Sequence, residues 1–277
     1  MKRILALLLT LSICAATLVG CTSKTTDVSV PPFEAKARQV VLKIGATPVP
    51  HAELLEFVKP ILEKENIKLE VVVFQDYVQP NTALVDKELD ANFFQHQPYL
   101  DSFNQERSQN LIAAGQVHVE PLGLYSKSLK NINDLKEGAV IAIPNDPSNA
   151  ARALLLLQSN GILKLKAGVG INATEKDIES NAKNIKITLA EAAQLPRVLE
   201  DVDAAVINTN YALPANLNPA KDALIIEGKD SPYANIVVVR NGDQARTEIK
   251  KLVEALNSPE IRKFIEDKYL GAVVPAF

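Results

Sequence analysis

Two kinds of hydrophobic pattern alternate along this chain. Short runs rich in β-branched residues have the length of buried strands, and between them apolar residues recur at helical spacing. Strands are expected at residues 40–45, 69–74, 91–94, 111–119, 122–125, 139–143, 185–189, 204–207 and 235–240. Helices are expected at residues 50–62, 80–89, 98–107, 150–160, 191–199, 244–257 and 259–269. Strand–helix–strand units of this size predict an α/β protein with parallel sheets covered by helices on both faces.

Local signals refine this prediction. Pro60 lies inside the first expected helix and predicts a kink there. Gly161 follows the helix at 150–160 and is its expected C-terminal cap. Thr174 and Asp177 have the spacing of a capping box, which predicts a helix after them. The strand–helix pattern restarts near residue 139, so we expect two α/β lobes.

The N-terminus has the layout of a secretory signal peptide. Lys2 and Arg3 precede a continuous apolar run, which is too short and wrongly flanked to be interpreted first as a membrane span. The run ends in Leu-Val-Gly-Cys at 18–21, which resembles the lipobox of bacterial lipoproteins. We therefore expect residues 1–20 to be removed and the Cys21 thiol to receive a diacylglycerol lipid with acyl chains such as palmitate. The alternative is an ordinary signal peptide followed by a coincidental cysteine.

The segment after this cysteine predicts a tether. Residues 21–39 show no apolar period and contain a Pro-Pro pair, so they cannot bury enough surface to order themselves. The mature protein is then expected at the cell membrane, held by lipid and facing the periplasm or the cell exterior.

Composition narrows the functional classes. An apolar content of 47% with 23% charged residues is typical of a globular domain. The formal net charge of −3 provides no basic face for nucleic acid and no polybasic patch for a membrane. Cys14 lies in the leader and Cys21 is reserved for lipid, so we expect no disulfide and no thiol nucleophile. We expect a monomer that uses no cofactor.

Catalytic and metal motifs are weak. Ser180 and Lys183 match Ser-x-x-Lys without its companion motifs, and 168–173 matches a dinucleotide fingerprint without the strand and helix that it requires. The three histidines have no partner at i, i+4 and no cysteine nearby, so no metal site is predicted. The chain is therefore predicted not to be an enzyme. An anchored enzyme acting on small amino-acid derivatives is the alternative.

Aromatic residues gather between residues 74 and 103, although they make up only 5% of the chain. Tyr77, Phe94, His96 and Tyr99 are expected on loops beyond strand ends, where α/β folds place ligand contacts, so we expect them to form a binding wall. The alternative is that these rings fill the core.

A second candidate segment joins a strand to a helix at 145–152. Arg152 is expected in the first turn, where free backbone N–H groups and a guanidinium would attract a carboxylate. The alternative is an Asn/Asp turn with a capping side chain and a surface arginine. An aromatic wall with a carboxylate clamp suits a small zwitterion that has an apolar side chain.

Several ordered motifs resemble the NlpA family, the methionine-binding lipoproteins of ABC importers. They occupy residues 75–81, 89–100, 143–149, 191–197, 205–212 and 231–235. The resemblance covers the chain from about Val40 to Phe277. It implies a two-lobed periplasmic-binding-protein fold of type II-like form, in which each lobe is a mostly parallel sheet flanked by helices and the ligand lies in the cleft between lobes. It places residues 40–124 and 233–277 in lobe one and 125–232 in lobe two.

The resemblance also implies the ligand and its contacts. Methionine would be delivered to a membrane permease with a cytoplasmic ATPase; a methionine-containing dipeptide or another apolar amino acid is the alternative. Arg152 would take the α-carboxylate, and Asn208 and Asn235 would hold the polar groups, with Asn149 as a further contact. The side-chain pocket would be lined by Tyr77, Phe94, His96 and Tyr99.

Overall fold

The computed structural model describes residues 39–228 and 231–277. The predicted signal peptide, Cys21 and all but the last residue of the predicted tether lie outside the described residues. Among the helices of the described part of the chain, none has the length and apolar character needed to cross a membrane.

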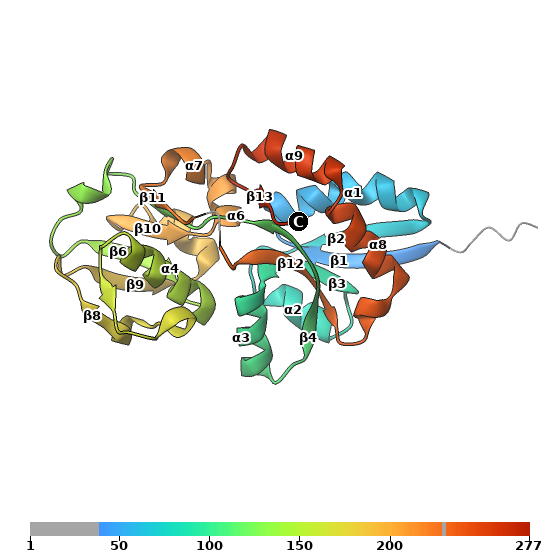
Figure 1. Ribbon diagram of the computed structural model, residues 1–277, viewed down its shortest axis with the longest axis horizontal. Helices are drawn as coiled ribbons and strands as arrows, with labels where there is room; N and C mark the ends of the chain where they lie inside the picture. Colours follow the sequence, from blue (N-terminus) through green and yellow to red (C-terminus); the bar gives the residue numbers. More distant parts are fainter. Residues whose placement is uncertain (1–38, 229–230) are drawn as a thin grey trace, which may run out of the picture. The chain divides into compact units, whose positions relative to one another are not determined.

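The first sheet has the strand order β13-β4-β12-β3-β1-β2 (Figure 1). Its strands are β1 (Val40–Ala46), β2 (Ile67–Val73), β3 (Ala91–His96), β4 (Leu111–Val119), β12 (Ala234–Arg240) and β13 (Val274–Pro275). The predicted parallel pairs are present, because β1 runs parallel to both β2 and β3. The other pairs of this sheet, β12 with β3 and β4, and β13 with β4, are antiparallel.

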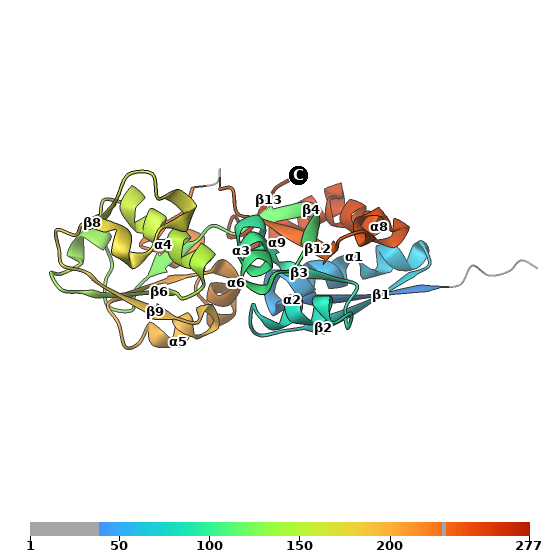
Figure 2. The same cartoon turned by 90° about the horizontal axis from the view of Figure 1, so that it is seen from below.

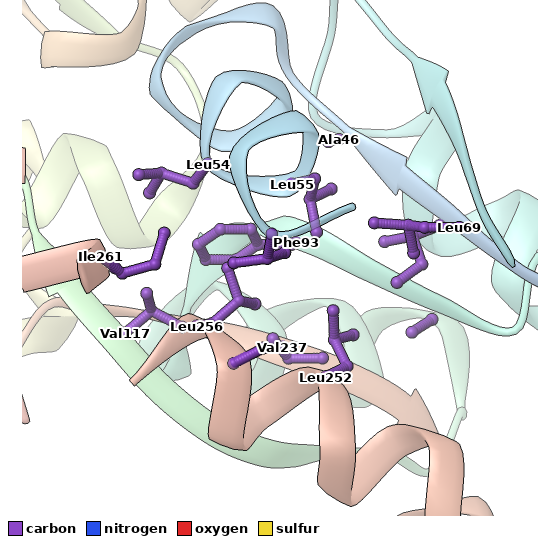
Figure 3. Close-up of a cluster of buried hydrophobic side chains, with 14 of the residues drawn as sticks. Ala46, Leu54, Leu55, Leu69, Phe93, Val117, Val237, Leu252, Leu256 and Ile261 are labelled. Carbon is purple, nitrogen blue, oxygen red and sulfur yellow. The ribbon is translucent and has the colours of Figure 1, made fainter. Parts of the chain in front are cut away.

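Helices cover both faces of the first sheet. They are α1 (Glu53–Lys64), α8 (Thr247–Leu256) and α9 (Pro259–Tyr269) on one face, and α2 (Gln79–Val85) and α3 (Gln97–Arg107) on the other. Alternation along β12 explains this arrangement, because successive strand side chains point to opposite faces. Val237 and Val239 pack with α1, α8 and α9 around Phe93 (Figure 3), whereas Ile236 and Val238 pack with α2 and α3.

The second sheet has the order β11-β5-β10-β6-β9. Its strands are β5 (Gly123–Tyr125), β6 (Val140–Pro144), β9 (Lys186–Ala190), β10 (Ala204–Ile207) and β11 (Ile225–Ile226). The β6 strand is parallel to β9 and β10, whereas β5 is antiparallel to β10 and β11. Figure 2 shows α4 (Pro147–Ser159) and α5 (Leu195–Val198) on opposite sides of this sheet. Ile141 and Ile143 accordingly pack with α4, and Ala142 packs with α5 and with α6 (Thr209–Ala212).

Shorter elements complete the second half. They are α7 (Pro219–Asp222) and the two-stranded ribbon of β7 (Lys164–Leu165) and β8 (Ile178–Ser180). The single-turn helices lie at Pro48–Ala52, Ile132–Asp134, Gly170–Asn172, Glu175–Asp177, Ala192–Gln194, Leu213–Ala215 and Asp243–Ala245.

Two connections join the sheets. The chain leaves the first sheet after Val119 and enters the second at Gly123, and it returns between Ile226 and Ala234. The lobe boundaries at residues 124/125 and 232/233 lie near these connections and stay a prediction.

Most expected elements occur, and the main difference is caused by strand pairing. The capping box of Thr174 and Asp177 forms, but the expected helix after it is wrong. Only one turn of 3-10 helix follows, because Ile178 pairs with Leu165 of β7 and continues as a strand. The helix expected from residue 244 begins at Thr247. Gly161 adopts φ +71° directly after α4, as the cap prediction requires.

Candidate functional site

The aromatic candidates lie at the carboxyl end of β3, an interior strand of the first sheet, and near the starts of α2 and α3. Phe94 and His96 were expected where the strand at 91–94 ends in a loop, but the strand continues and both lie within β3. The strand is longer than predicted because Asn235 of β12 pairs with His96 and extends the ladder. Tyr99 lies in the first turn of α3, and Tyr77 immediately precedes α2.

All eight predicted ligand-binding residues line one cavity, which we name the inner cavity. Its lining consists of Tyr77, Phe94, Gln95, His96, Tyr99, Glu120, Asn149, Arg152, Asn208, Thr209, Asn210 and Asn235. The space that water centres can occupy inside it is about 20 Å³. Since about 10–15 Å³ suffices for one water, an amino acid enters only if contacts around the cavity open.

Three rings form the aromatic end of the inner cavity. The centroids of Tyr77, Phe94 and Tyr99 lie 5.7–5.9 Å from one another, which is the range of favourable aromatic contact. The Tyr99 hydroxyl donates to the Tyr77 carbonyl at 3.0 Å, and the Tyr77 hydroxyl donates to Asn210 Oδ1 at 2.5 Å. These bonds hold the polar ends of the rings, so their faces form an apolar wall.

His96 has both ring nitrogens engaged. Its Nδ1 accepts from the Tyr99 backbone N–H at 3.3 Å and caps α3, so the Nε2–H donates to Asn149 Oδ1 at 3.2 Å. Burial and the neighbouring Arg152 guanidinium lower the pKa of His96 to about 3, so the ring is neutral at pH 7. His96 therefore positions its neighbours while one face of its ring lines the cavity.

Arg152 is not a surface arginine, because only 3% of it is exposed. Its Nε donates to Glu227 Oε1 at 3.0 Å, and its Nη2 bonds to Glu227 Oε2 and to the Glu120 carbonyl, the latter at 2.8 Å. Its guanidinium also lies 4.3 Å from the centre of the Tyr233 ring. Glu227 thus occupies the Nε/Nη2 edge, and Nη1 forms no hydrogen bond with a described residue.

The helix N-terminus in the same segment is already occupied by a side chain. Asp146 caps α4, and its Oδ1 accepts from the Asn149 backbone N–H at 2.9 Å and from the Ser148 hydroxyl at 3.0 Å. Our expectation that these amides would hold a ligand carboxylate is therefore wrong. The Asn/Asp turn with a capping side chain is the correct interpretation of this part of the motif.

Two buried amide atoms in the cavity lack a hydrogen-bond partner within the described residues. Asn208 donates from Nδ2 to Asn149 Oδ1 at 2.9 Å, and its own Oδ1 is unpartnered. Asn210 accepts from Tyr77 through Oδ1, and its Nδ2 is unpartnered. Because leaving a buried polar atom unbonded costs about 1–3 kcal/mol, one free acceptor and one free donor here point to a polar ligand.

A second group that the sequence did not nominate surrounds Glu120. This carboxylate is 6% exposed and lies beside two buried histidines, with Oε1 at 2.8 Å from His118 Nε2 and 3.3 Å from His51 Nε2. Burial lowers the pKa of His51 to about 4 and that of His118 to about 3, and it raises the pKa of Glu120. His51 Nε2 also lies 3.0 Å from Asn235 Oδ1.

This cluster contains the donor types of a metal site. His51, His118 and Glu120 present three ligand atoms within 4.8 Å of one another, and zinc accepts two imidazoles with a carboxylate. The prediction of no metal site came from residue spacing along the chain. Spacing could not reveal potential ligands that only the folded structure brings together. Here Glu120 Oε1 is hydrogen-bonded to His118 and lies 3.3 Å from His51 Nε2, which is itself hydrogen-bonded to Asn235. We therefore interpret the cluster as a hydrogen-bonded cradle that orients Glu120.

The buried contact between Thr47 and His51 resembles the arrangement of a catalytic nucleophile and its base. Thr47 Oγ1 lies 2.7 Å from His51 Nδ1, and the other nitrogen of His51 faces Glu120. Thr47 is 0% exposed and is not among the residues that line the inner cavity, so a substrate there does not reach its hydroxyl. The hydroxyl instead orients the His51 ring.

Sequence reasoning missed four lining residues for different reasons. Thr209 and Asn210 lie inside the motif at 205–212, just after β10. Their position beyond a strand end could have marked them as candidate lining residues. Gln95 lies beside two predicted residues on β3. Glu120 was hidden, because a carboxylate before Pro121 is ordinarily expected to be solvated and its burial depends on His51, which is distant in the chain.

Comparison with known proteins assigns the chain to a family. The NlpA lipoprotein family pattern matches residues 42–277. The chain belongs to the NlpA lipoprotein family. The probable D-methionine-binding lipoprotein MetQ of Vibrio cholerae is 41% identical over 277 residues, which cover 99% of each chain. The D-methionine-binding lipoprotein MetQ of Escherichia coli is 42% identical over 236 residues, or 84% of this chain and 87% of that protein.

Solved structures of this family share the fold. A nutrient-binding protein from Burkholderia cenocepacia, solved bound to methionine, aligns with a TM-score of 0.83 and 52% identity over 85% of this chain and all of that one. The lipoprotein Tp32 from Treponema pallidum aligns with a TM-score of 0.84 and 42% identity, covering 86% of this chain and all of that one. The NlpA-family fold class predicted from the sequence is thus confirmed.

The buried histidines predict a pH-dependent stability. The folded pKa values of His51, His96 and His118 lie below the ordinary value of 6.5, so the unfolded chain binds protons that the folded protein does not. Their stabilising contribution is complete above about pH 6.5 and is lost as the pH falls toward their folded values. Glu120, whose pKa is raised, partly offsets this loss. We expect the free energy of unfolding from urea titrations to fall between about pH 7 and pH 5.

A matched variant isolates one histidine. His118→Gln should lower this pH slope by about one proton, because a glutamine does not titrate. A slope that is the same in wild type and variant, or no slope at all, would show that these rings are already protonated in the folded protein.

Proposed function

We propose that this NlpA-family protein is an extracytoplasmic receptor that binds methionine and delivers it to an ABC importer. The observation that carries the proposal is the inner cavity, which has charged and amide groups at one end and three aromatic rings at the other. The methionine bound to the Burkholderia relative supports the same ligand class. Permease and ATPase partners follow from the family resemblance.

The charged end of the inner cavity suits the zwitterion. Arg152 offers Nη1 to the α-carboxylate, since its other edge is held by Glu227. Glu120 and the unpartnered Asn208 Oδ1 are acceptors for the α-ammonium, and both line the cavity. A buried carboxylate or ammonium is costly unless charged or dipolar partners replace its water. Asn235 completes this end and borders the Glu120 cluster through His51.

The aromatic end suits the thioether. Tyr77, Phe94 and Tyr99 supply ring faces, and sulfur–aromatic contacts contribute about 0.3–1.5 kcal/mol. Asn149 receives a supporting role in this proposal, because its Oδ1 and Nδ2 are bonded to neighbours that shape the cavity. An enzyme would need a nucleophile beside a base where a substrate can reach it. Among the described residues, Thr47 and His51 have that arrangement, but Thr47 is buried and does not line the inner cavity.

Entry of the ligand requires opening and reclosing of the cavity. Contacts from the first-sheet half to the second-sheet half include Tyr77 to Asn210, and His96 to Asn149. Their separation would open the cavity to solvent, and a ligand that bonds to both halves would favour their return. We propose residues 40–124 with 233–277, and residues 125–232, as the two lobes that move.

Calorimetry against a panel of amino acids tests the function. L- and D-methionine, leucine and glutamate should be titrated into the protein, because the chain contains no tryptophan to report binding. Methionine should bind more tightly than leucine, and glutamate should bind least, since a second carboxylate would lose its hydration against an apolar wall. Equal affinity for methionine and glutamate would contradict the proposed pocket, and turnover of methionyl peptides would favour an enzyme.

Arg152→Ala tests the carboxylate contact. Removing one partner of a buried charge pair costs roughly 2–5 kcal/mol of binding, so methionine affinity should fall by that amount. Arg152→Lys should restore only part, because an ammonium cannot keep the Glu227 fork while it also meets the ligand. Methionine amide should bind the wild type weakly and be nearly indifferent to the substitution.

The double variant Arg152→Ala/Glu227→Gln is the control. Arg152→Ala alone leaves the half-buried Glu227 without its cation, so part of any binding loss reflects lower stability. The second substitution removes that charge and should raise the urea midpoint without restoring methionine binding. Wild-type methionine affinity in the single variant would place the carboxylate site elsewhere.

We also propose that Cys21 carries the lipid that holds the protein at the membrane. The Leu-Val-Gly-Cys ending of the apolar leader supports this proposal. Cys21→Ala should prevent acylation and leave an uncleaved precursor or a released protein, which detergent phase separation and intact mass spectrometry can detect. Cys14→Ala is the matched control, because that cysteine lies within the leader. An acyl mass shift that persists in Cys21→Ala would contradict the lipobox interpretation.

A further inference from the structure

A larger cavity lies directly beyond the aromatic end of the inner cavity. We name it the outer cavity. Water centres can occupy about 510 Å³ of it, compared with about 20 Å³ in the inner cavity. Tyr77 and Tyr99 line both cavities, so these two rings form the wall between them.

Ring contacts define a direction through the two cavities. His96 lies beside Arg152, and its ring is 6.4 Å from that of Tyr99. Tyr99 is 5.7 Å from Tyr77, and Tyr77 is 5.0 Å from Tyr211, which lines the outer cavity. A methionine held at Arg152 by its carboxylate therefore directs its sulfur toward the outer cavity.

The outer cavity combines aromatic faces with negative charge. Tyr77, Tyr99 and Tyr211 line it together with the carboxylates of Asp76, Asp146 and Glu191, and its lining contains neither lysine nor arginine. Across residues 39–228 and 231–277, none of these three carboxylates forms an ion pair with a lysine or arginine.

The carboxylates act on the tyrosines at this wall. Burial raises the pKa of Tyr211, and the charges of Asp76, Asp146 and Glu191 raise it further. Burial, Asp146 and Asp76 raise the pKa of Tyr99 in the same way. The negative potential of these carboxylates therefore reaches the hydroxyl groups of the tyrosines that line the outer cavity.

We propose that the outer cavity lets this receptor bind methionine derivatives whose sulfur carries an additional alkyl group and a positive charge, the sulfonium class. Such a ligand keeps the carboxylate and ammonium of methionine and adds one substituent and one positive charge at the sulfur. A cation placed over aromatic faces is stabilised by the ring quadrupole, as in aromatic sites for quaternary ammonium. The carboxylates, which have no lysine or arginine ion-pair partner among the described residues, supply the opposite charge, and the room beyond Tyr77 and Tyr99 accommodates the added group. The inference rests on the proposed methionine function.

The experiment compares three ligands by calorimetry on the full chain. They are methionine, S-methylmethionine, and 2-amino-5-methylhexanoate. The last is an isostere that has the shape of S-methylmethionine but an uncharged side chain, because a CH group replaces the sulfonium sulfur. S-methylmethionine should bind about tenfold more tightly than the isostere, because only the charge distinguishes them. Its affinity should fall with added salt, whereas that of methionine should change little.

Charge-removing variants locate the effect. Glu191 is exposed, and its side chain forms no hydrogen bond or ion pair with a described residue. Glu191→Gln should therefore weaken the binding of S-methylmethionine about threefold, the scale of one exposed charge pair. Adding Asp76→Asn should bring the loss to about tenfold. Methionine and the isostere should change less than about twofold. Glu254→Gln, on α8 and outside the outer cavity, is the control for the same change in net charge.

Each outcome decides between the two proposals. If methionine binds and S-methylmethionine does not, the sulfonium proposal fails and the methionine function stands. If S-methylmethionine binds equally well to the wild type and the double variant, the outer cavity is not its site and the proposal fails. Absence of methionine binding would overturn the proposed function and this inference together.

Discussion

The buried guanidinium of Arg152 is the interaction on which the rest of the site depends. Arg152 belongs to α4, which packs against the second sheet, and its guanidinium bonds to the Glu120 carbonyl in one of the two segments that connect the sheets. It also bonds to Glu227 and packs on Tyr233, both in the other connection. A buried cation is tolerated only if other groups replace the hydration that it loses. The groups that do so for Arg152 come from both segments that connect the sheets, so Arg152 holds these segments together.

This arrangement couples binding to the geometry of the connections. Arg152 already bonds to both segments that connect the sheets. A ligand carboxylate bound at its Nη1 would therefore stabilise one relative arrangement of these two segments. The aromatic and amide contacts across the cavity, such as Tyr77 with Asn210, act in the same direction. A ligand shifts such an equilibrium only by its difference in affinity between the two states, and here most of that difference would come from groups bonded to both halves.

Burial sets the charge of the site. The rings of His51, His96 and His118 lose their hydration, so their pKa values fall and they remain neutral at pH 7. Neutral rings are hydrogen-bond donors that orient Glu120 and Asn149 without adding positive charge. Besides the neutral His96, the acidic and basic side chains that line the inner cavity are those of Glu120 and Arg152. In the proposed function they face the ammonium and the carboxylate of a zwitterion.

Periodicity alone predicted most strands and helices, because strands and helices bury faces with different spacings. It failed where tertiary pairing overrode a local signal. The capping box at Thr174 opened a single turn, since the next residues pair with β7. The strand expected at 91–94 continued to His96 instead of ending in a loop, since Asn235 of β12 extends the ladder beside it. In both cases pairing with another strand satisfied the backbone hydrogen bonds that the local sequence left free.

The sequence by itself was enough to recognise the α/β architecture and, through ordered motifs, the family and the eight residues that line the inner cavity; the lipid anchor at Cys21 stays a prediction from the sequence. These features depend on local chemistry or on motifs that can be recognised along the chain. Only the tertiary structure decided that Asp146 occupies the helix N-terminus, that Glu227 takes one edge of Arg152, and that Glu120 lies between His51 and His118. The physical reason is that desolvation and charge pairing depend on which distant residues meet, and the spacing of residues along a chain does not contain that information.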